Sequence, residues 1–243
     1  METIRSKHFK AIFLFLGLQG AAILLINLYL SNSAEGAVSF ADRLILGYEP
    51  FKNGVFLLPI PLLFYMWLNR YINLKDRIIR FKSRTQITKD RIRIGGILSF
   101  VFTIEYVVVT GLISIFDQSL INWQNTNSFF FSLNQFVFQG QFMSVLFYTV
   151  VSFFLILLIG LFLFDLVYLI FDNYFFSWIV ILYLVIWDMF VPSNQSLLFR
   201  RFYINYSFYT GDEKVGLTLV GAVALIVIIL LCRKVAGDKK DFI

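Results

Sequence analysis

The sequence predicts an all-α integral membrane protein with six transmembrane helices, and three observations lead to that fold class. The 243 residues are 59% hydrophobic and only 15% charged, whereas soluble domains are about 45–50% apolar and about 25% charged. The apolar residues form continuous runs, unlike the alternating pattern of a membrane barrel. Several runs have the length of about 20 residues that a helix needs to cross a bilayer. Because backbone groups in hydrocarbon must be bonded internally, each span is expected to be helical.

The six spans make the chain one transmembrane domain, residues 1–243. The second span contains Pro59 and Pro61, whose missing N–H donors predict a kink or partial unwinding. The fourth span begins a stretch, 141–171, that is long for one crossing, so its end is expected to project into the cytosol. The spans are placed at residues 11–30, 51–67, 94–116, 141–163, 174–191 and 215–232.

The first span could also be read as a cleaved signal peptide, because basic residues precede it and small residues follow. Its 20 apolar residues exceed the roughly 7–15 of a signal-peptide core. This length favours a span that is retained.

Basic residues fix the expected orientation, since Lys and Arg near span ends are enriched on the cytoplasmic side. Sixteen of the 21 basic residues fall on one side of a six-span topology, in the N-terminal segment, in loop 70–93 and after the last span. Both termini are therefore predicted to be cytoplasmic. The net charge of +6 is explained by topology, and no nucleic-acid partner is expected.

Motifs for enzymatic chemistry are missing from the sequence. It has one cysteine, Cys232, and one histidine, His8, which leaves little material for a zinc site and none for an internal disulfide. It also lacks a Gly-x-x-x-x-Gly-Lys-Ser/Thr phosphate loop, a Gly-x-Ser-x-Gly elbow and a His-Glu-x-x-His helix. The chain is therefore not expected to be an enzyme or to hold a metal or cofactor.

The basic segment between spans two and three is the most informative part of the sequence. Leu74, Ile78 and Phe81 have helical spacing and would share one face. Arg77, Arg80 and Arg84 would gather on another face of the same short amphipathic helix, which could lie at the headgroups or against a protein. The alternative is a plain loop whose charges only set topology and attract anionic lipid.

Six spans, cytoplasmic termini and a basic helical loop reading Ile-Arg-Phe-Lys-Ser-Arg at 79–84 resemble the membrane subunits of ABC-2 type transporters. That family also has a partly re-entrant aromatic hairpin between spans five and six on the outer side. The corresponding segment here, 192–214, contains six aromatic residues: Phe199, Phe202, Tyr203, Tyr206, Phe208 and Tyr209.

The resemblance implies a coupling helix that docks on a separate ATPase subunit, which would bind ATP. It also implies a second permease copy, as a homodimer or a pseudo-symmetric heterodimer. The residues expected to dock on the ATPase are Asp76, Arg77, Arg80, Phe81 and Arg84.

A few polar residues fall inside the spans. Glu105 lies in the middle of span three, where a charge is costly and is expected to face the bundle or a wet cavity. Gln19 and Asn27 share a helix face in span one. These three could line a translocation cavity, and the alternative is a structural role in helix packing. Asp165, Asp172 and Asp188 are expected at span ends near interfacial water, without a site role.

The expected function is that of a permease subunit in a bacterial cell membrane, surrounded by lipid, which exports a peptide or another amphipathic molecule, including antimicrobial-peptide export or self-immunity. The alternatives are a proton-coupled secondary carrier, the membrane subunit of an importer, and an immunity protein that binds a toxin without moving it.

Overall fold

The computed structural model describes residues 2–72, 84–117, 119–191, 196, 198–210 and 215–239. Most of the described residues lie in helices, and the described residues form no strand. A single isolated bridge joins Ala37 and Ser128. The predicted all-α class is confirmed.

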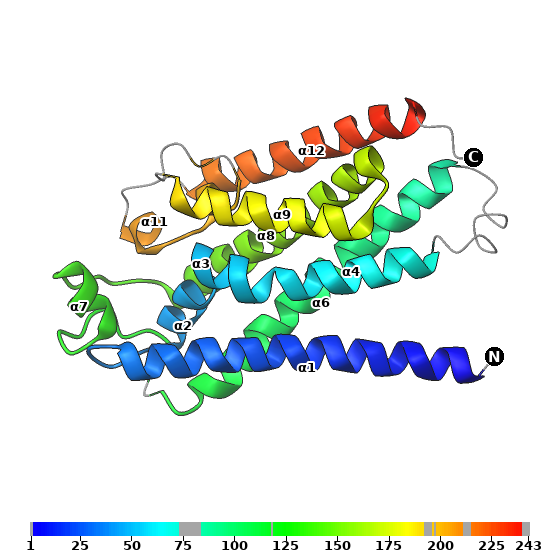
Figure 1. The fold of residues 1–243 in the computed structure, drawn as a ribbon. Coiled ribbons are helices and arrows are strands. Elements are labelled where there is room, and N and C mark those ends of the chain that lie inside the picture. The colour runs from blue at the N-terminus through cyan, green and yellow to red at the C-terminus, as the bar shows by residue number, and fades with distance from the viewer. Residues whose placement is uncertain are drawn as a thin grey trace.

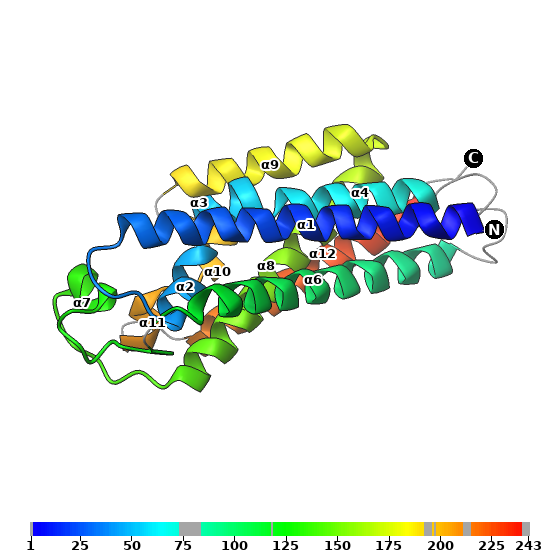
Figure 2. The same ribbon diagram turned by 90° about the horizontal axis from the view of Figure 1, so that it is seen from below.

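Long antiparallel helices build the bundle, and short helices cap one of its ends (Figure 1). The start of α1 and the end of α12 lie at the opposite end, together with the end of α4 and the start of α6 (Figures 1 and 2). We call this the basic end and the other the cap end. The long helices are α1 (Glu2–Ser33), α4 (Pro59–Ile72), α6 (Arg84–Ser114), α8 (Phe142–Phe171), α9 (Tyr174–Phe190) and α12 (Val215–Lys239).

Short elements connect the long helices. At the cap end, α2, α3 and the π-helix η1 lead from α1 into α4, and α7 lies between α6 and α8 (Figure 1). Two more short helices follow α9. Their bounds are α2 (Phe40–Gly47), α3 (Pro50–Lys52), η1 (Asn53–Leu57), α7 (Phe129–Asn134), α10 (Phe199–Phe202) and α11 (Tyr206–Thr210).

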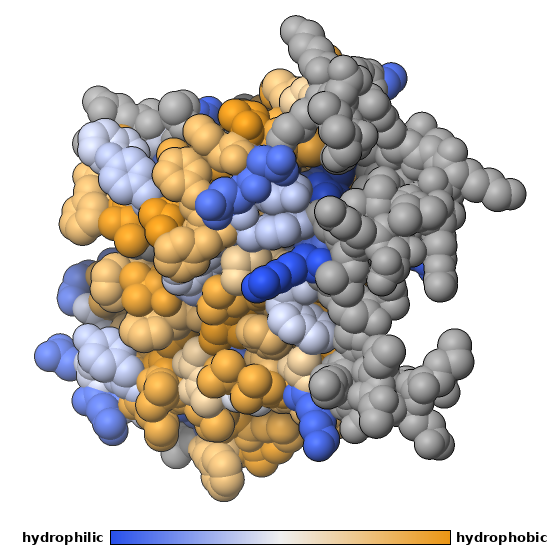
Figure 3. Space-filling model, turned by 45° about the vertical axis from the view of Figure 1, so that its right-hand side comes forward, coloured by the Kyte–Doolittle hydropathy of each residue, from blue (hydrophilic) through white to orange (hydrophobic). Residues whose placement is uncertain are grey.

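Five stretches among the described residues are long and apolar enough to cross a membrane. The described part of α9 is shorter, with 17 residues, so the structure supports a multi-pass protein and does not by itself establish six crossings. Apolar side chains cover much of the flank seen in Figure 3. The five stretches are Lys10–Ser33, Pro50–Arg70, Lys89–Ser114, Phe142–Phe171 and Val215–Ala236.

The second span is interrupted where the prolines predicted it. Residues Asn53–Leu57 form a π-helical turn, in which the Leu58 N–H donates to the Asn53 carbonyl over 2.7 Å. Pro59 and Pro61 supply no N–H to the turn before them, so the backbone widens there instead of continuing as a regular α-helix.

Most of the long helices extend beyond their predicted spans, and the extensions of α8 and α6 matter for the site described below. Helix α8 continues without a break to Phe171, as the long apolar stretch suggested. Helix α6 begins at Arg84, ten residues before the predicted start of span three, so the end of the predicted loop 70–93 is helical. The early start is possible because Arg91, which the sequence assigned to that loop, is neutralised inside the bundle.

Helix α8 is the central helix of the bundle. In the most apolar 18-residue stretch of α8, 67% of the residues are buried. The corresponding share for α12, which lies on the periphery, is 11%. Aromatic rings fill the space between α8 and the helices around it: the Phe153 ring lies 4.6 Å from that of Tyr106 in α6 and 5.8 Å from that of Tyr48. Such tilted and edge-on contacts add to the burial of apolar surface.

Candidate functional site

A buried carboxylate joins three helices near the basic end. Asp165 of α8 accepts a hydrogen bond of 2.9 Å from Arg91 of α6. Its second oxygen accepts from Nε of Arg233 in α12. All three side chains are about 3% exposed. Two guanidinium groups thus share one carboxylate away from water.

Aromatic rings extend this ionic cluster to two more helices. The Arg91 guanidinium lies over the Tyr168 ring, 5.1 Å from its centroid, a favourable cation–π geometry. Tyr168 in turn stacks on Tyr174 of α9 at 4.0 Å. The Tyr65 hydroxyl of α4 donates to the Arg91 backbone carbonyl over 3.3 Å. We call Tyr65, Arg91, Asp165, Tyr168 and Arg233 the basic-end cluster.

The expectation that Asp165 sits near interfacial water is wrong. The residue is 2% exposed because α8 continues past it to Phe171 and its partners come from the ends of α6 and α12. Sequence reasoning missed the cluster by ending span four at residue 163. If 142–171 is read as one helix, Asp165 falls inside an apolar span, where an ionisable residue calls for a buried partner.

A second buried ion pair closes the cap end. Arg43 of α2 binds Asp117, just after α6, through two hydrogen bonds of 2.6 and 2.8 Å. The same guanidinium donates to the Asn27 carbonyl over 3.3 Å and to the Ser31 hydroxyl over 3.0 Å, both on α1. This bidentate pair is geometrically strong, and it fixes the ends of α1 and α6 to α2.

The cap has its own polar core around Asp42. Ser39 and Asp42 form a capping box at the start of α2. The Asp42 carboxylate also accepts 2.8 Å hydrogen bonds from the Trp123 indole N–H and the Tyr206 hydroxyl. Burial raises the pKa of Asp42, and the donated hydrogen bonds oppose that rise. The Ser-Phe-Ala-Asp run at 39–42 was the available sequence signal for this cap.

Between the two ion-paired ends, α1 and α6 carry polar side chains with atoms that have no hydrogen-bond partner among the described residues. Gln19 is fully buried, and neither of its amide atoms is hydrogen-bonded among the described residues. Glu105 of α6 lies against the next residue of α1, because a Cβ added at Gly20 would lie 3.5 Å from its Oε1. The Oε2 of Glu105 is buried without a partner in the described part of the chain. Unpaired polar groups of this kind are costly in an apolar interior.

Asn27 lies two turns further along α1 and is also fully buried. Its Nδ2 donates to the Ile23 carbonyl over 2.9 Å, whereas its Oδ1 has no partner among the described residues. We call Gln19, Asn27 and Glu105 the polar seam. The structure thus places all three predicted cavity residues on the α1–α6 pair, and their contact with a cargo stays a prediction.

The predicted docking residues are not tested by the structure. Asp76, Arg77, Arg80 and Phe81 lie outside the described residues. Arg84 is the first residue of α6, and its side chain is not described.

Comparisons with protein-family models, with curated proteins and with solved structures gave no match for this chain.

Replacing Asp165 with Asn should destabilise the bundle strongly. The change removes the negative charge that two buried guanidinium groups share, and breaking a buried pair by removing one partner costs about 3–5 kcal/mol. Thermal unfolding in a mild detergent should register a large drop in melting temperature. The matched control is Asp172→Asn, which makes the same change at an exposed C-cap of α8. Equal stability of the two variants would contradict the assigned role of Asp165.

Proposed function

We propose that this chain is the membrane permease subunit of an ABC transporter, which moves a peptide or another amphipathic molecule with energy from a separate ATPase. The polar seam is the observation that carries the proposal. Buried polar groups without partners are rare because they cost free energy. They become favourable if the α1–α6 contact opens to water or cargo in another state of the cycle.

The two ion-paired ends support an alternating-access mechanism. The Arg43–Asp117 pair and its hydrogen bonds tie α1 and α6 to α2 on the cap side of the polar seam, and the basic-end cluster ties α6 to α4, α8 and α12 on the other side. Helix α6 carries Arg91 about two turns from its start, and Asp117 follows three residues after its end. A displacement of α6 would therefore loosen one set of contacts while the other holds.

The ends of α4 and α6 support the proposed site of ATPase docking. Helix α4 ends at Ile72 and α6 begins at Arg84, both at the basic end. Tyr65 and Arg91 link these two helices just inside that end. A force on the intervening segment would act on the linked pair of helices and on the cluster beneath it. Because the start of α1 and the end of α12 lie at this same end (Figure 1), the proposal makes both termini cytoplasmic. The proposed location of the permease is the plasma membrane of a bacterium.

An Arg77/Arg80/Arg84→Glu variant should lose the ATPase. Charge reversal on the proposed docking face replaces attraction by repulsion, and pull-down of the co-expressed ATPase from membranes measures the loss. The charge-matched control is Lys10/Arg93/Lys234→Glu, three exposed basic positions at the same end. Full ATPase binding by the first variant would refute this placement of the coupling helix.

Gln19→Leu should separate stability from transport. Leucine has a similar volume and needs no hydrogen bond, so the variant is expected to be more stable by about 1–3 kcal/mol. It should transport a labelled amphipathic peptide poorly, because the seam loses a polar group that meets cargo or water. Leu18→Met, on the exposed side of the same turn, serves as the control. Unchanged transport by the stabilised variant would assign Gln19 to packing alone.

A proton-coupled carrier is the second candidate, and the partly buried Glu105 carboxyl is the observation that favours it. Its Oε2 has no described partner, so it is free to bind a proton. Glu105→Gln distinguishes the two functions. An ATP-driven permease should keep peptide transport that depends on ATP, whereas a carrier should lose transport that depends on a pH gradient. Transport by the wild type that follows the gradient and ignores ATP would favour the carrier.

A further inference from the structure

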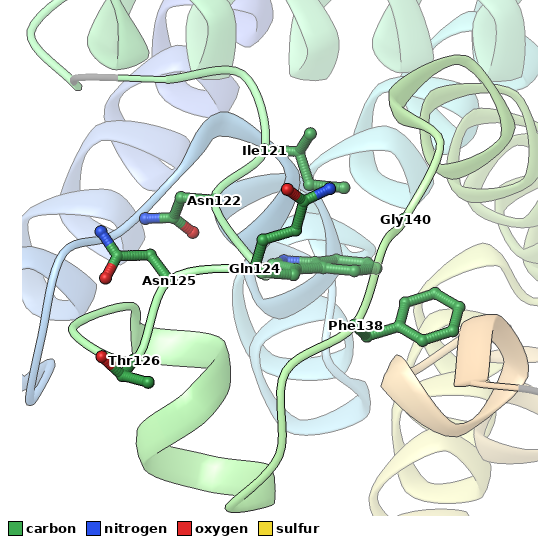
Figure 4. A pocket seen from close by; sticks show the side chains of 8 residues that line it. Ile121, Asn122, Gln124, Asn125, Thr126, Phe138 and Gly140 are labelled. Atoms are coloured by element: carbon green, nitrogen blue, oxygen red, sulfur yellow. The ribbon is translucent and has the colours of Figure 1, made fainter.

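A groove on the outside of the cap combines amide side chains with an aromatic floor (Figure 4). Its volume is about 500 Å³, within the roughly 300–1,000 Å³ of small-molecule sites. The groove is formed by 121–126 together with Phe138 and Gly140. A smaller cavity of about 250 Å³ shares Phe138 and Gly140 and extends the groove toward Gln139, Gln141 and Tyr209.

The floor of this cap groove is rigid. Trp123 is 1% exposed, its indole N–H is held by Asp42, and its ring stacks on Phe130 at 4.8 Å. The backbone of Gly140 lies so close that an added Cβ would stand 2.7 Å from the Trp123 ring. Only glycine permits this approach, so the groove is fixed by packing that the cap itself requires.

The rim presents hydrogen-bonding groups that the fold does not use. Gln124 and Thr126 are exposed, and their side chains make no hydrogen bond with another described residue. Asn122 is oriented, because its Nδ2 donates to the Ala37 carbonyl over 2.7 Å. Its Oδ1 is buried without a partner among the described residues and lies on the Gln124 side in Figure 4, so Gln124 and Thr126 are the groups that the rim offers to a ligand.

None of the residues that line the groove carries a charge. The segment 118–141 contains nine Asn and Gln residues and no Asp, Glu, Lys, Arg or His. Each amide offers both donors and an acceptor, and a hydroxyl offers both as well. A phosphate or carboxylate would find no cation among the lining residues, and an amine would find no anion.

We propose that the cap groove binds a neutral, hydroxyl-rich ligand, an oligosaccharide chain, on the cap side of the membrane. The side chains of Gln124 and Thr126 pair with sugar hydroxyls, and the apolar faces of the sugar rings lie on Ile121 and Phe138, above the buried Trp123. This site is independent of the polar seam and of ATP. It provides the protein with a point of attachment to a glycan outside the bilayer.

Binding of chitotetraose and maltotetraose to the full chain tests the proposal. The protein should be placed in lipid nanodiscs, because detergents with sugar headgroups would compete. Isothermal titration should give saturable binding of at least one neutral oligosaccharide, and Gln124→Ala/Thr126→Val should weaken it by about tenfold or more. Asn127→Ala, an exposed amide in the same segment outside the groove, should bind as the wild type does.

Hydrogen exchange measured on the wild-type chain is a second test of oligosaccharide binding, and it needs no variant. The bound oligosaccharide should protect the backbone amides of 122–126 and leave those of α12 unchanged. No saturable binding of either oligosaccharide, equal weakening by the control variant, or tighter binding of a terminally blocked tetrapeptide than of both sugars would overturn the proposal.

Discussion

One buried carboxylate, that of Asp165, holds the basic end of this bundle together. It binds Arg91 and Arg233, two buried cations from different helices. Buried charges are tolerated only when paired and hydrogen-bonded. The early start of α6, the position of α12 against α8 and the stacking of Arg91 on Tyr168 all depend on this pairing.

At the cap end, buried charges are likewise paired and hydrogen-bonded, by different residues. Arg43 and Asp117 form a bidentate pair there, and Asp42 organises the cap through Trp123 and Tyr206. Between the paired ends, the polar seam contains groups whose hydrogen-bonding capacity is unused. These unused groups, which lie between two ion-paired ends, are the physical basis for proposing a protein that opens. A bundle selected only for stability would replace Gln19 with an apolar residue.

Much of the fold followed from the sequence, because its signals were local. Apolar runs predicted the long helices, and Pro59 and Pro61 predicted the irregular turn at η1. The interaction partners of Asp165 could not be predicted in this way. Arg91, Asp165 and Arg233 are separated by some seventy residues at each step, so only the three-dimensional packing of α6, α8 and α12 brings them together. The same applies to Asp42 and Tyr206 in the cap.

If this chain is the proposed permease, α1 and α6 separate at the basic end when the partner ATPase acts on it. Spin labels attached at positions Lys10 and Arg93, both exposed, would report the distance between these helices by pulsed electron paramagnetic resonance. The exposed Cys232 would first be changed to Ser so that it is not labelled. We predict that the distance distribution measured with the ATPase and ATP gains a population absent without nucleotide. Identical distributions in the two states, with the ATPase bound and hydrolysing ATP, would contradict the account.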